Sequence, residues 1–228
     1  MIRKQTRLAL LAVAAVAVTS TAQAAYNSGD LLVGFTSSGA ANDYIFDVGT
    51  LSGLGSSKTW NLGADLGGDF TSSQFASADW GVIGALSLTH TIYSSAGSAG
   101  VPSEIPNGFN TINTDVKGVG ANSVTGSEVM PGRTTANSWY FQTDQAAGTP
   151  GNYFFNNLDN PNNQTGVAAY LYANDNNGDP ATLLGNFTIS QDGSTLTFTA
   201  VPEPASVSAL AGLGLLVAGL RRRFTCKA

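Results

Sequence analysis

Three oxygen-bearing side chains in the C-terminal third of the chain have the spacing of a cation-binding loop. Asp175, Asn177 and Asp179 occupy alternate positions, which is how an Asp-x-Asn-x-Asp calcium loop begins. The pattern then departs from such loops, because its sixth position is Pro180 instead of glycine and its twelfth is Asn186 instead of a bidentate glutamate. The same residues are also typical of a turn between two strands. A weak calcium site and a plain turn are therefore both open interpretations.

Side chains for hydrolytic or phosphoryl-transfer chemistry are scarce. The one histidine, His90, stands in a Thr-His-Thr setting where two predicted strands meet. The sequence has no Gly-x-Ser-x-Gly elbow, no His-Glu-x-x-His zinc helix and no Gly-x-x-x-x-Gly-Lys phosphate loop. Glutamate, the usual acid of a glycosidase pair, occurs only at Glu104, Glu128 and Glu203. The sequence therefore predicts a protein that is not an enzyme and has no cofactor, with calcium as the one candidate ion.

The C-terminal end has three consecutive parts, each suited to a step of sorting at a membrane. They are Pro202, Glu203 and Pro204, then sixteen uncharged residues (205–220), then Arg221, Arg222 and Arg223. The two prolines keep the segment around Glu203 extended and out of a preceding sheet, where a processing enzyme can reach it. The uncharged run predicts a transmembrane helix about 24 Å long at ~1.5 Å per residue. The arginines predict a stop on the cytoplasmic side.

The first 24 residues have the three zones of a secretory signal peptide. A basic stretch at residues 2–7 precedes eleven apolar residues and a segment of small residues. Ala22 and Ala24 fit the shallow pockets of a signal peptidase, which places the expected cut before Ala25. An N-terminal membrane anchor, the alternative, would need a longer apolar run.

The segment between the two ends, residues 25–200, is strongly acidic. It contains fourteen Asp and Glu residues but only Lys58, Lys117 and Arg133, a net charge of −11. Such a field repels nucleic acid and anionic lipid head groups, so no nucleic-acid partner is expected. The single cysteine, Cys226, lies beyond the arginines, and the acidic domain therefore has no disulfide.

Residues 201–228 resemble the PEP-CTERM sorting signal, which is also catalogued as the ice-binding protein C-terminal domain. The resemblance rests on the Pro-Glu-Pro motif, the apolar run and the arginines, and it implies a bacterial protein. It further implies that an exosortase, a membrane transpeptidase-like protease, recognises Glu203 with its two prolines and cuts nearby. The protein would be tethered to the inner membrane by the helix at 205–220 and then released to the cell surface or the extracellular matrix of a biofilm.

The acidic middle is expected to fold as one mostly β domain. Eight segments have strand patterns: residues 30–36, 43–48, 82–89, 91–94, 138–143, 167–173, 183–190 and 195–201. Short strands between turn signals favour a β-sandwich. One short helix is expected over residues 72–78, with Thr71 or Ser72 as its N-cap.

Three further local features bear on the packing of this domain. A second helix over residues 111–118 is a hypothesis with less support in the pattern. Asp192-Gly193 predicts a tight hairpin between the last two strands. Trp60, Trp80 and Trp139 are expected in the core.

These observations predict an exported, non-enzymatic protein of structural or adhesive type at the cell surface or in the extracellular matrix. Its expected partners are signal peptidase, an exosortase-type enzyme, the membrane and extracellular polysaccharide. The alternative is a secreted carbohydrate- or calcium-binding module that uses the loop-rich segment 96–133 or the loop at Asp175.

Overall fold

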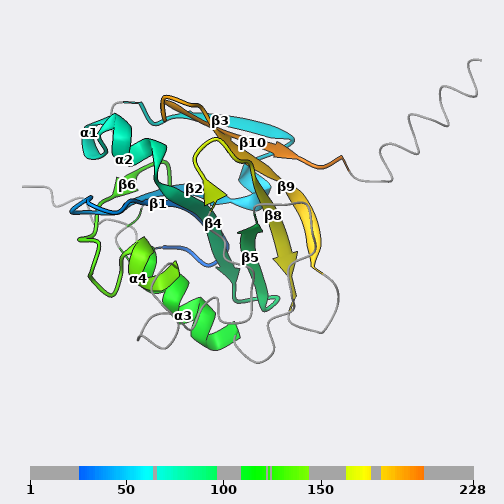
Figure 1. The fold of residues 1–228 in the computed structure, drawn as a ribbon. Helices are drawn as coiled ribbons and strands as arrows, with labels where there is room; N and C mark the ends of the chain where they lie inside the picture. Colours follow the sequence, from blue (N-terminus) through cyan, green and yellow to red (C-terminus); the bar gives the residue numbers. More distant parts are fainter. Residues whose placement is uncertain are drawn as a thin grey trace, which may run out of the picture.

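The computed structural model (Figure 1) describes residues 26–63, 66–96, 109–121, 123, 125–143, 163–175 and 181–202. The strands are β1 (Asp30–Thr36), β2 (Tyr44–Thr50), β3 (Ser57–Asn61), β4 (Asp79–Leu86), β5 (Thr91–Ala96), β6 (Glu128–Val129), β7 (Asn163–Gln164), β8 (Ala169–Asn174), β9 (Thr182–Ile189) and β10 (Thr195–Ala200). The helices are α1 (Leu66–Asp69), α2 (Ser72–Ala76), α3 (Phe109–Val119), α4 (Trp139–Thr143) and the short 3-10 helix η1 (Leu51–Gly53). The predicted signal peptide and the predicted helix at 205–220 lie outside the described residues. None of the helices within the described ranges has the length and apolar character needed to span a bilayer.

The strands pair into one antiparallel sheet in the order β3-β10-β9-β8-β5-β4-β1-β2-β6, and β7 pairs with β4. The prediction of a mostly β domain is confirmed, but the two separate sheets of a sandwich are not seen. The reason is the pairing of β5 with β8, in which Ile92 lies opposite Asn174 and Ala96 opposite Tyr170. This ladder joins what would otherwise be two sheets.

The single sheet curls until its two halves face each other. Phe46 on β2 and Trp60 on β3 belong to opposite ends of the strand order, yet their ring centroids are 6.5 Å apart. The Trp60 ring also stacks on Phe187 of β9, with centroids 6.2 Å apart. The main core fills the space between the halves, and its largest members include Phe35, Tyr44, Trp80, Leu171, Phe187, Leu196 and Phe198.

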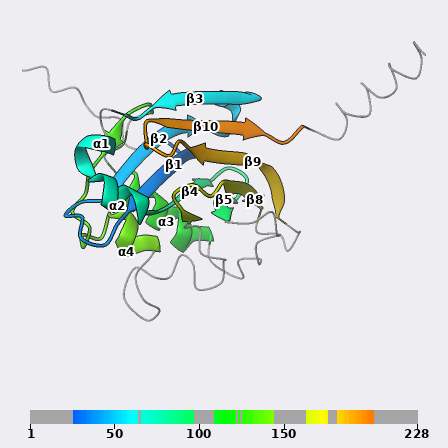
Figure 2. The ribbon, with the colours of Figure 1, turned by 45° about the horizontal axis from the view of Figure 1, so that its top comes forward.

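A second core lies on the other face of β1, β2, β4 and β5, where α3 and α4 cover the sheet (Figure 2). Along β1, Leu31 and Val33 point into the main core while Leu32 points toward the helices, as a period of two requires. Helix α3 contributes four buried side chains at helical spacing to this core: Phe109, Ile112, Val116 and Val119. The molecule thus has three layers, and β1 is buried on both faces.

The prediction of a strand at residues 138–143 is wrong, because this segment forms helix α4. Ser138 accepts a hydrogen bond from the backbone N–H of Phe141 at 3.1 Å, which is an N-cap contact. Trp139 then lies flat against Gly34 of β1, where an added Cβ would be 1.8 Å from the ring. The strand prediction rested on a short run of three aromatic residues at 139–141, of which only Trp139 is fully buried while its two neighbours are partly exposed.

Several other local predictions are confirmed. Helix α2 begins after Thr71, whose side chain and that of Gln74 form a reciprocal capping box. The second helix, predicted over residues 111–118 with less support, is present as α3. Trp80 and Trp139 are fully buried and Trp60 is half-buried. Strand β3, which has few apolar residues, was not predicted.

Candidate functional site

The β9–β10 hairpin determines where the C-terminal tail leaves the fold. Its turn contains Asp192, whose carboxylate accepts hydrogen bonds from Ser190 Oγ at 2.6 Å and from the backbone N–H of Ser194 at 3.0 Å. The bond from Ser190 is the main cause that lowers the pKa of Asp192 to about 2. Gly193 follows with a φ of 73°, the left-handed conformation expected for this turn. The predicted hairpin is therefore confirmed, with its turn tightly hydrogen-bonded.

The sheet holds the chain as far as Val201. The backbone N–H of Ala200 donates to Ser56 at 2.9 Å, and that of Val201 donates to Leu184 at 3.0 Å. Pro202 has no N–H to continue the ladder, and it is exposed. The predicted role of the first proline in ending the sheet is consistent with this geometry. The Pro-Glu-Pro motif begins one residue after the last backbone hydrogen bond of β10.

An apolar groove of about 370 Å³ lies beside this exit point. The residues that line it come from η1 and the loop after it, from β9, from β10 and from the two residues that follow β10; they include Leu51, Leu183, Leu184, Phe198, Val201 and Pro202. Val201 itself is 44% exposed. The tail therefore leaves the domain next to an exposed apolar surface, which the sequence did not reveal because the lining residues are more than a hundred positions apart.

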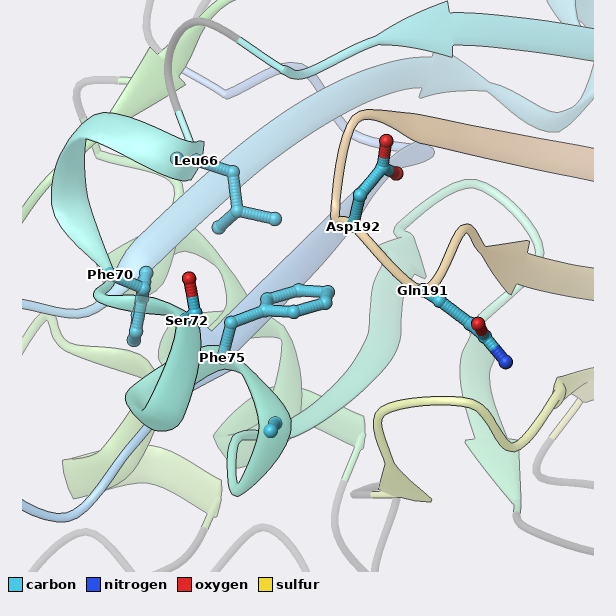
Figure 3. A pocket seen from close by; sticks show the side chains of 8 residues that line it. Leu66, Phe70, Ser72, Phe75, Gln191 and Asp192 are labelled. Atoms are coloured by element: carbon cyan, nitrogen blue, oxygen red, sulfur yellow. The ribbon is translucent and has the colours of Figure 1, made fainter.

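A second cavity, of about 260 Å³, lies at the turn end of the same hairpin (Figure 3). Leu66, Phe70 and Phe75 come from the α1–α2 region, and Gln191 and Asp192 come from the turn. Figure 3 shows the Phe75 ring extending across the cavity toward the turn. Because Asp192 already accepts three hydrogen bonds from Ser190 and Ser194, its carboxylate is committed to shaping the turn.

Two buried carboxyl groups on β2 and just before it have unusual pKa values. Burial raises the pKa of Asp43 to about 6, opposed by the backbone N–H of Tyr140, which donates to Oδ2 at 2.6 Å, and by the charge of Arg133. Burial likewise raises the pKa of Asp47 to about 6, opposed mainly by the backbone N–H of Gly49 at 2.8 Å. Both carboxyls are nearly inaccessible to solvent. Their hydrogen bonds anchor α4 and the β2 turn, which is a structural function.

Arg133 is held in place beside Asp43. Its Nε donates to Thr36 Oγ1 at 3.1 Å, and its guanidinium carbon lies 3.5 Å from the centroid of the Tyr140 ring. A stacked guanidinium of this kind is a favourable cation–π contact. Arg133 therefore connects β1 to α4 and partly offsets the charge of Asp43.

The remaining predicted residues are placed as follows. Asp175 is half-buried directly after β8, and Asn186, the twelfth position of the calcium pattern, lies in β9 opposite Thr199. His90 is exposed in the β4–β5 turn with a φ of 53°, and its ring meets Phe109 edge-on at 4.9 Å. Outside the described residues lie Asn177, Asp179, Glu203, Pro204, Arg221, Arg222, Arg223, Ala22, Ala24 and Ala25.

Comparison with known proteins identifies the C-terminal segment. The family model of the PEP-CTERM protein-sorting motif matches residues 200–223. No curated protein and no solved structure shows significant similarity to the chain. The match begins at Ala200, the last residue of β10, so the motif starts where the sheet ends. A motif of this kind implies an exported protein that an exosortase processes at the membrane.

Proposed function

We propose that the chain is an exported cell-surface or extracellular-matrix protein of non-enzymatic structural or adhesive type, sorted and processed through its C-terminal tail. The observation that carries this proposal is the boundary at β10. The sorting motif matches from residue 200, and the last backbone hydrogen bond of the sheet is made by Val201. Folded domain and sorting signal therefore adjoin with an overlap of two residues.

This boundary limits the room that a processing enzyme has. If the membrane helix begins at residue 205, only Pro202, Glu203 and Pro204 separate it from the last hydrogen-bonded residue. Three extended residues span at most about 11 Å. The enzyme then works close to the end of β10, and the apolar groove beside Pro202 faces the membrane or the enzyme during processing.

The hydrogen bonding of the polar side chains supports a non-enzymatic domain. Asp47 accepts bonds from Gly49 N–H and Ser123 Oγ, and Asp192 accepts its bonds within the turn. The imidazole of His90 packs against Phe109. Each of these groups has a structural role, which is the arrangement expected of a scaffold.

The test compares Glu203→Ala with Glu128→Ala in the native host. Glu128 is an exposed glutamate on β6, far from the tail, and the substitution controls for loss of a carboxylate. We expect the wild type and the control to be released from the membrane fraction, and Glu203→Ala to remain in it. Equal release of all three proteins, or retention of all three, would overturn the sorting role.

A further inference from the structure

The outward face of β3, β10 and β9 presents an ordered array of hydroxyl and amide side chains. Strand registers place Thr59, Thr197 and Thr188 in one row across the three strands. The hydroxyls of Thr59 and Thr197 are 3.4 Å apart. A second row adds Ser57, Thr199, Asn186 and, on β8, Tyr170; a third contains Asn61 and Thr195. We call these nine residues the hydroxyl face.

Five residues of the hydroxyl face are exposed and four are partly exposed, and none of the nine is charged. Its threonines alternate with the buried side chains Leu196, Phe198 and Phe187, so the polar residues point away from the main core. In Figure 2 these strands lie on the side of the molecule opposite α3 and α4. Lys58, the one charged residue of β3, lies on the other face, with its Nζ 5.2 Å from the centroid of the Trp60 ring. The nine neighbouring positions of the hydroxyl face therefore carry no charge, although the domain as a whole is acidic.

The geometry points to a neutral polysaccharide as the partner: we propose that the hydroxyl face binds an uncharged, polyhydroxylated polymer. A hydroxyl donates one hydrogen bond and accepts others, and an amide does both, so the array can pair with sugar hydroxyls in either direction. Neighbouring strands are about 4.8 Å apart, and the four-strand row from Ser57 to Tyr170 therefore spans about 14 Å.

Two further features favour a neutral polysaccharide as the ligand. The net charge of −11 between residues 25 and 200 repels anionic polymers. Tyr170, opposite Asn186, is half-buried against the small cluster of Ala96, Tyr172 and Ala181 and leaves part of an aromatic ring at one end of the row. A ring with a polar tip suits a ligand that has both apolar and hydroxyl surfaces. A polymer also presents many equivalent segments, so weak contacts gain from repeated engagement.

The experiment removes hydroxyls without changing shape. The triple substitution Thr59→Val, Thr188→Val, Thr197→Val keeps β-branched side chains that suit strands. A control triple, Thr89→Val, Thr125→Val, Thr134→Val, makes the same chemical change at exposed positions off the face. A single Thr197→Ser substitution keeps the hydroxyl and serves as the conservative variant.

Binding is measured by native gel electrophoresis in gels containing extracellular polysaccharide from the native host, divided by anion exchange into neutral and acidic fractions. We expect the neutral fraction to retard the wild type, the control triple and Thr197→Ser, and the Val triple to bind at least about tenfold more weakly. No retardation of the wild type by the neutral fraction, stronger binding to the acidic fraction, or equal binding of the Val triple would overturn the proposal.

This inference rests on the proposed function, because export brings the domain to such polymers. The experiments distinguish failure of the polysaccharide proposal from failure of the sorting proposal. Gel retardation is measured on isolated protein, processed or full-length, whereas the Glu203→Ala test reads membrane release alone. A protein that is released but not retarded would refute the hydroxyl face and leave sorting intact.

Discussion

The stability of the domain should fall as the pH rises from 4.5 to 7.5, and Asp43 should account for a large part of that fall. Burial raises its pKa from 3.8 to about 6 despite the neighbouring charge of Arg133. Between those two values the folded protein holds a proton that the unfolded chain has released. Folding is therefore favoured at the acidic end of the window, and this advantage is lost as the pH passes the folded-state pKa.

The magnitude follows from the size of the pKa change. A rise from 3.8 to about 6 corresponds to roughly 3 kcal/mol of unfolding free energy in total, of which about 2 kcal/mol is lost between pH 4.5 and 7.5 because the rest is lost at lower pH. For a domain of this size, about 2 kcal/mol is a shift of roughly 4–8 °C in Tm. Burial raises the pKa of Asp47 to the same extent and adds to the fall in stability. The lowered pKa of Asp192 has the opposite effect, because it makes the stability rise with pH, but only below about pH 4.

The assay is thermal unfolding from pH 4.5 to 7.5 for the wild type, Asp43→Asn and Glu128→Gln. Asparagine keeps an oxygen that can accept from Tyr140 N–H but has no charge to bury. We expect Asp43→Asn to lose a substantial part of the pH dependence but not all of it, because burial also raises the pKa values of Asp47, Asp79 and Asp115. Glu128→Gln, which removes one exposed charge, should retain nearly all of it. An Asp43→Asn profile parallel to the wild type, or stability that increases toward pH 7.5, would show that the folded protein does not hold a proton on Asp43 in this range.

Three further predictions concern packing, capping and ions. Gly34→Ala should destabilise the domain by about 3 kcal/mol in urea unfolding, because the new methyl overlaps the Trp139 ring; a cost below about 1 kcal/mol contradicts the packing described. Thr71→Ala should cost about 1 kcal/mol through loss of the capping box, and more than the helix-interior control Thr114→Ala. Calcium should leave Tm unchanged if the loop at Asp175 is a turn, whereas a bound ion at 100 times its Kd would add about 2.7 kcal/mol.

Much of the fold could be predicted because local patterns agree with the final packing. The predicted strand at residues 30–36 coincides with β1, and the threonine cap of α2 is where the sequence placed it. The Asp-Gly turn is a local signal that needs no tertiary information. The position of the tail was likewise predictable, since its motif is contiguous in the chain.

The errors arise where tertiary contacts decide the structure. Residues 138–143 contain a short aromatic run of the kind found in strands, but Ser138 caps a helix and the Trp139 ring packs against Gly34. Strand β3 is stabilised mainly by pairing with β10 across more than a hundred residues. Whether the strands form one sheet or two depends on the pairing of β5 with β8, which no local sequence pattern specifies.

The candidate surfaces were hidden for the same reason. Thr59 and Thr197 are 138 positions apart, so the hydroxyl face exists only through strand register. The groove at Pro202 is also assembled from distant segments. A threonine every second residue in β10 was the one local signal, and alone it indicates only an exposed strand face.

The most direct test of the account is the intact mass of the protein isolated from its native host. The mature protein should begin at Ala25 and end after Val201, within or just beyond the Pro-Glu-Pro motif, because β10 is held in the sheet up to Val201. A mass that includes every residue to Ala228 would contradict processing at the tail. A C-terminus inside β10 would contradict the boundary between the folded domain and its sorting signal.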